Sequence, residues 1–115
     1  MLYNELPVFK SSYDLVIELF NFSKKLPRDF KYTIVQDLKK ESLEILTCIY
    51  KASKNYNKKI ILQEAQEKLF LVRLKIRILK DLKQINQKKF ISLNLKIENV
   101  SKQLVGWEKK NRWKI

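Results

Sequence analysis

Three cations spaced along one segment are the residues best suited to chemistry. Arg73, Arg77 and Lys80 stand at positions i, i+4 and i+7, which share one face of a helix. Guanidinium groups stay charged and can bind phosphate oxygens in bidentate fashion. Such a row is either a solvated, solubilising surface or a phosphate-binding face. The large excess of positive charge favours phosphate binding by the protein as a whole.

Three carboxylates offer a second possible site. Asp37, Glu41 and Glu44 stand near positions i, i+4 and i+7 of a helix, and their oxygens could hold the metal ion of a nuclease. The commoner role of such residues is ion pairing with neighbours such as Lys39 and Lys40. Because neither a His nor a second acidic cluster completes a site, we expect no metal site and no catalytic residues.

The composition excludes several classes of enzyme. The 115 residues include 25 Lys or Arg, 12 Asp or Glu, no His, one Cys and one Gly, which gives a formal charge of +13. Without His there is no Ser–His or Cys–His couple, and one Gly cannot build a Gly-rich phosphate loop. The sequence therefore predicts a binding or scaffold protein that needs no cofactor, with RNA or DNA as its polyanionic partner.

The positive charge is uneven along the chain, and no membrane segment is visible. Residues 58–86 carry a net +5 and residues 87–115 a net +6. No apolar run approaches the roughly 18 residues of a membrane span, and residues 1–5 lack the pattern of a secretory signal. Together with the lone Cys48, these features predict a cytoplasmic protein without a membrane partner.

Apolar periodicity and rare breaks predict the elements that position these side chains. Helices are expected over about residues 8–25, 28–53, 58–83 and 88–109, with a tail at 110–115, because Pro7, Pro27, residues 55–57 and residues 84–87 interrupt the pattern. Four helices with short connections favour a single all-α domain over residues 1–115. Its expected architecture is an antiparallel up-down-up-down four-helix bundle.

Two further sets of apolar residues either lie in the core of the bundle or contact a partner. In the tail region, Trp107 is expected to complete the core stripe of the last helix, whereas Trp113 among basic residues is free to contact a partner. The third helix carries a second apolar line of Phe70, Leu71, Leu74, Ile78 and Leu82. This line is either part of a wide core face or a surface for self-association, which a small bundle favours.

Three stretches of the chain resemble a known family. They read LPRDFKYTIVQDL at residues 26–38 with LEIL at 43–46, LVRLKIRILKDL at 71–82, and VSKQLVGW at 100–107. Their order and spacing resemble the bacterial four helix bundle protein group over about residues 7–110. That group includes the accessory variability protein (Avd) of diversity-generating retroelements and proteins encoded in intervening sequences of ribosomal RNA genes. One departure is Val105 before Gly106, where the family often has a second Gly.

The resemblance implies a homopentamer, in which five bundles form a tapered basic barrel with a central pore. For the retroelement branch it implies association with the reverse transcriptase and its RNA during mutagenic cDNA synthesis. The basic third-helix positions of the family match Arg73 and Arg77, so these residues are the first candidates for nucleic-acid or reverse-transcriptase binding. Lys80 and the turn residues Arg28 and Lys31 follow. The alternative implied by the ribosomal branch is a self-assembling structural unit with another partner.

Overall fold

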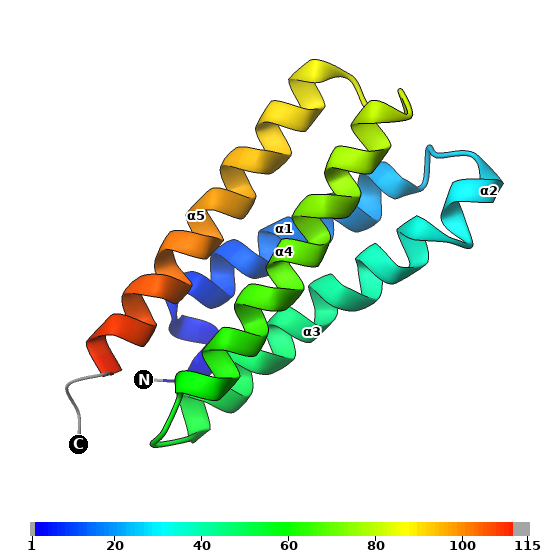
Figure 1. The fold of residues 1–115 in the computed structure, drawn as a ribbon. Helices are drawn as coiled ribbons and strands as arrows, with labels where there is room; N and C mark the ends of the chain where they lie inside the picture. Colours follow the sequence, from blue (N-terminus) through cyan, green and yellow to red (C-terminus); the bar gives the residue numbers. More distant parts are fainter. Residues whose placement is uncertain (1, 112–115) are drawn as a thin grey trace.

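The computed structural model describes residues 2–111 and contains four long helices (Figure 1). Their bounds are Pro7–Ser23 for α1, Ile34–Lys54 for α3, Lys59–Asp81 for α4 and Gln87–Asn111 for α5. A short 3-10 helix, η1 at Tyr3–Glu5, precedes α1, and the one-turn helix α2 at Arg28–Lys31 joins α1 to α3. No strand occurs among residues 2–111, so the predicted all-α class is confirmed.

The four long helices form one antiparallel bundle. Successive helices run in opposite directions and pack against each other, and α5 closes back onto α1 (Figure 1). The bundle is an elongated rod with principal extents of 48 × 22 × 22 Å. One end therefore carries α2 and the α4–α5 turn, and the other carries η1 and the α3–α4 turn (Figure 1).

The single helix expected over residues 28–53 is wrong, because the chain breaks at Tyr32 and Thr33. Helix α2 ends at Lys31, and Thr33 has φ −126° and ψ −105°, far from helical values. The Thr33 hydroxyl donates a 2.7 Å hydrogen bond to the carbonyl oxygen of Asp29. Such local side-chain bonds compete with the helical ladder, and they leave no mark in the apolar spacing on which the prediction rested.

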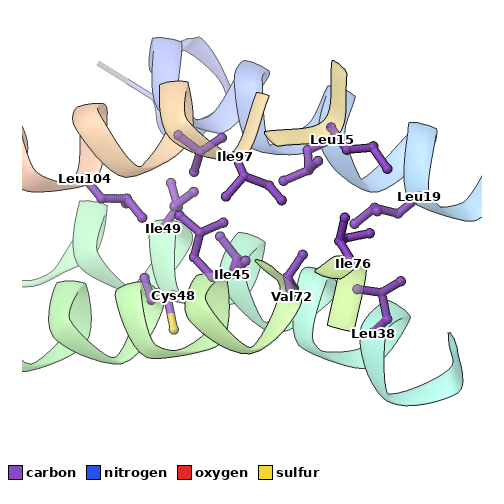
Figure 2. Close-up of a cluster of buried hydrophobic side chains, with 14 of the residues drawn as sticks. Leu15, Leu19, Leu38, Ile45, Cys48, Ile49, Val72, Ile76, Ile97 and Leu104 are labelled. Atoms are coloured by element: carbon purple, nitrogen blue, oxygen red, sulfur yellow. The ribbon is translucent and has the colours of Figure 1, made fainter. Parts of the chain in front are cut away.

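The core is aliphatic and runs the length of the rod. Figure 2 shows side chains of all four long helices meeting at the bundle axis. The alternating three- and four-residue spacing places these side chains on the inner stripe of each helix. Cys48 lies in this core, where burial, followed by the nearby charge of Glu64, raises the pKa of its thiol. A thiol in this environment is a packing residue, not a nucleophile.

Candidate nucleic-acid interface

Arg73 and Arg77 occupy successive turns of one side of α4, as their spacing predicts. The Arg73 guanidinium Nη2 lies 3.0 Å from Glu98 Oε2 on α5, and Arg77 Nε lies 3.2 Å from Asp81 Oδ2 one turn further along α4. Both ion pairs are solvent-accessible. Exposed pairs of this kind are weak, so each guanidinium can exchange its carboxylate for a phosphate at small cost.

Lys80 follows on the same side of α4 but faces the neighbouring helix. Its ammonium group lies 4.4 Å from the ring centroid of Phe90 on α5, which is cation–π distance. Arg73 and Lys80 therefore both engage α5, while Arg77 stays on its own helix. The predicted row of cations exists, but two of its three side chains contact α5.

Arg28 and Lys31 lie on α2, at one end of the bundle. The last turns of α4, which carry Arg77 and Lys80, lie at the same end (Figure 1). The Arg28 guanidinium sits 5.5 Å from the ring centroid of Tyr32. Lys31 has no ion-pair partner within residues 2–111. The structure thus brings four of the five predicted cations toward one end of the rod and leaves Arg73 nearer its middle.

The excess positive charge lies at the ends of the bundle, which the linear count did not reveal. The middle section, residues 10–23, 34–49, 62–76 and 91–102, holds eight basic and eight acidic residues. Residues 24–33 and 77–90, hereafter the α2 end, hold nine basic and two acidic residues. Residues 2–9, 50–61 and 103–111, hereafter the opposite end, hold six basic and two acidic residues. A polyanion is therefore attracted to the ends, and most strongly to the α2 end.

Ion pairs between helices account for much of the neutral middle section. Glu41 Oε1 of α3 lies 2.9 Å from Lys75 Nζ of α4, and Glu44 Oε2 lies 3.2 Å from Lys68 Nζ. The partners of these carboxylates are α4 lysines, in place of the expected Lys39 and Lys40. Within residues 2–111, no three His, Cys, Asp or Glu side chains are grouped so that they could hold a metal ion.

Glu18 of α1 forms a further ion-pair site, with two lysines of α5. Its Oε1 lies 2.9 Å from Lys89 Nζ, and its Oε2 contacts the Lys96 ammonium. Burial alone would raise the pKa of this carboxyl, but the two ammonium groups outweigh burial and hold the pKa below its ordinary value of 4.5. Glu18 therefore ties α1 to α5 as long as it is ionised.

Glu18→Gln is expected to lower the free energy of unfolding by about 1–3 kcal/mol at neutral pH, because two charge-assisted bonds are lost. A carboxyl whose folded pKa is lowered adds stability above its unfolded pKa, and this stability is lost as the pH falls through the folded pKa. Below about pH 4.5 the wild-type curve should thus fall more steeply than that of the variant. Urea denaturation across this range measures both curves, and parallel curves would contradict the assignment.

The structure describes one of the two tryptophans. Trp107 is half-buried and packs against the core, as expected for the end of the α5 stripe, and the Lys58 ammonium lies 5.9 Å from its ring. The prediction that Trp113 contacts a partner falls outside the described residues.

The comparisons with known proteins identify the bundle. A family model described as bAvd-like matches residues 8–111. The chain belongs to the bAvd-like family. This match confirms the family resemblance drawn from the three sequence stretches. A search of curated proteins returns no match.

A solved structure has the same fold as this bAvd-like chain. It is the 1.70 Å crystal structure of a protein of unknown function from the S23 ribosomal protein family of Bacteroides thetaiotaomicron VPI-5482. The two share 17% identity and superpose with a TM-score of 0.80, covering 89% of this chain and 95% of that chain. At this identity the similarity establishes the shared four-helix architecture.

The bAvd-like bundle leaves an apolar line on the outside of α4. Phe70, Leu74, Ile78 and Leu82, hereafter the outward α4 line, are all exposed, while Leu71 between them is half-buried. The alternative that these four side chains belong to a wide core face is therefore wrong. No helix within residues 2–111 has the length and apolar character needed to cross a membrane.

Proposed function

We propose that this protein is a non-enzymatic accessory subunit of a diversity-generating retroelement. It binds nucleic acid through its basic surface and associates with the retroelement reverse transcriptase during mutagenic cDNA synthesis. The observation that carries the proposal is the bAvd-like match over residues 8–111, in a chain with a formal charge of +13. An accessory subunit needs binding surfaces only, which suits a chain that lacks His altogether.

Self-assembly into a homopentameric barrel is part of this proposal. Its support within the protomer is the outward α4 line, whose four apolar side chains are exposed and lie outside the core described for residues 2–111. Contiguous exposed apolar surface of this kind marks interaction sites. Ion pairs flank the line toward α3 and toward α5, as in interfaces with an apolar centre and a polar rim.

The deciding experiment is a pull-down of the tagged protein from its native cells, with and without nuclease treatment. The captured protein is analysed by mass spectrometry and the captured RNA by sequencing. Recovery of a reverse transcriptase that survives nuclease, together with one retroelement RNA, is the expected result. Recovery of ribosomal RNA, or of the protein alone, would remove the retroelement role.

Arg73→Ala combined with Arg77→Ala is expected to leave the helical circular dichroism signal intact and to weaken RNA binding. Because each single-strand phosphate contact contributes about 0.7 to the salt slope, the slope should fall by up to about 1.4. Fluorescence anisotropy with a short labelled RNA at several salt concentrations measures both quantities. Unchanged affinity and slope would show that this side of α4 does not contact phosphates.

The second candidate is the structural role of a ribosomal intervening-sequence protein. It is kept because the solved neighbour comes from the S23 ribosomal protein family. In this case the bundle assembles with itself and needs no reverse transcriptase. A gene inside a ribosomal RNA gene would favour this candidate, and a gene beside a reverse transcriptase gene would favour the first.

A further inference from the structure

Nine cations from five segments of the chain gather at the α2 end of the rod. They come from the chain after α1, from α2, from the last turns of α4, from the α4–α5 turn and from the first turn of α5 (Figure 1). The set is Lys24, Lys25, Arg28, Lys31, Arg77, Lys80, Lys83, Lys88 and Lys89. Only Asp29 and Asp81 oppose them within the same residues. The rod is 22 Å across, so these charges share a small area.

Some of these lysines occupy positions that are unfavourable for the fold itself. Lys83 lies two residues after the end of α4 and has φ 60°, a left-handed conformation that glycine adopts without cost. Lys88 and Lys89 stand in the first turn of α5, which contains no acidic residue, although the helix dipole there favours negative charge. Folding alone would select Gly at position 83 and Asp or Glu at position 88, so the charge of Lys83 and Lys88 points to a use outside the fold. Lys89 differs, because its ammonium group pairs with Glu18 of α1.

Four lysines of the opposite end have a structural explanation. Lys51 and Lys54 lie in the last turn of α3, and Lys109 and Lys110 lie in the last turn of α5. Cations at helix C-termini complement the dipole and stabilise the helix. Lys80 at the α2 end also lies in the last turn of its helix, and Lys59 at the opposite end begins α4, which has no acidic residue in its first turn. The two ends therefore differ in the amount of their charge.

An exposed aromatic ring lies within the cationic α2 end. Tyr32 follows α2 directly and is 68% exposed, with the Arg28 guanidinium 5.5 Å from its ring centroid. Proteins that bind single strands without sequence preference combine a basic surface with aromatic rings on which bases stack. A paired duplex offers phosphates but no free base face, so a ring of this kind discriminates between the two.

We propose that the α2 end binds single-stranded nucleic acid, with its cations on successive phosphates and Tyr32 stacked against a base. This inference rests on the proposed nucleic-acid role and specifies its surface and its ligand. The strand is engaged across the end of the rod, to which Arg77 lies nearer than Arg73. Binding at this end is independent of base sequence because the contacts are to phosphates and to a base face.

Two variants with matched loss of charge test where the strand binds. The α2-end variant replaces four exposed or half-exposed cations by Gln at positions Arg28, Lys31, Lys83 and Lys88. The control variant replaces four exposed cations of the opposite end by Gln at positions Lys51, Lys54, Lys109 and Lys110. Both are titrated against a short fluorescent single-stranded RNA between about 50 and about 200 mM salt.

The α2-end variant should bind about 10- to 100-fold more weakly near 0.1 M salt, with a salt slope lower by up to about three, since each single-strand phosphate contact contributes about 0.7. The control variant should stay within a few-fold of wild type. Equal losses in both variants, or no loss in the α2-end variant, would overturn the location while leaving nucleic-acid binding in place. Absence of salt-dependent RNA binding by the wild-type protein would instead refute the proposed nucleic-acid role itself.

Tyr32→Ala tests the stacking part of the inference. Affinity for the single strand should fall about tenfold, while affinity for the same sequence as a duplex should not change. Tyr56→Ala, at an exposed tyrosine of the opposite end, is the matched control and should change neither. Equal effects of Tyr32→Ala on single strand and duplex would exclude base stacking.

Lys83→Gly separates binding from folding. Glycine relieves the left-handed backbone at this position, so the thermal midpoint should rise. RNA affinity should nevertheless fall, because one phosphate contact is removed. A variant that is more stable and binds as tightly as wild type would show that Lys83 is not part of the binding surface.

Discussion

Leu74→Glu is expected to convert the proposed assembly into folded monomers. Leu74 lies in the centre of the outward α4 line and is 43% exposed in the protomer. If this line meets a second copy, the substitution buries an unpaired carboxylate in an apolar contact, which costs several kcal/mol. Since each 1.4 kcal/mol is about tenfold in affinity, the association should weaken at least about 100-fold.

Light scattering coupled to size exclusion measures this change of mass, and circular dichroism shows whether the helices persist. Leu43→Glu is the matched control, because Leu43 is similarly exposed, at 47%, but lies on α3 and outside the line. The control should assemble like wild type. A wild-type protein that is already monomeric would refute the assembly proposal, and dissociation by both variants would refute the assignment to the α4 face.

Ile76→Ala is expected to lower the free energy of unfolding by about 2–5 kcal/mol. The Ile76 side chain is fully buried at the bundle axis, together with side chains of the other three long helices (Figure 2). Removing its outer carbons loses the transfer free energy of the buried atoms and leaves a cavity between rigidly packed helices. A loss of this size is a large fraction of the total stability of a small domain.

Ile78→Ala, two residues further along the same helix, is the control for this effect. Ile78 is 37% exposed, so the same substitution should cost less than about 1 kcal/mol in the protomer. Both variants are compared by urea denaturation in a Leu74→Glu background, so that any contact between copies does not add to the result. Similar losses at the two positions would contradict the orientation of α4.

The sequence predicted which cations share one side of a helix but not their partners, as Arg73 shows. Spacing alone placed Arg73, Arg77 and Lys80 on one side of a helix, because helical geometry is local and repeats every 3.6 residues. Spacing could not show that Glu98 pairs with Arg73 or that Phe90 lies beneath Lys80, since these partners belong to another helix. Lys88 was not singled out from the sequence, because no motif contains it. A weak signal existed in the absence of acidic residues between Lys83 and Lys89.

The sequence by itself determined the all-α class and the four long helices, since apolar periodicity and the rarity of Gly and Pro act within each segment. Its motifs also determined the family, which the bAvd-like match confirmed. The tertiary structure decided which apolar line of α4 is core and which is surface, because only the neighbouring helices bury a face. It also decided where the charge lies: successive helices reverse direction, so cations as distant in sequence as Arg28 and Lys88 meet at one end of the rod.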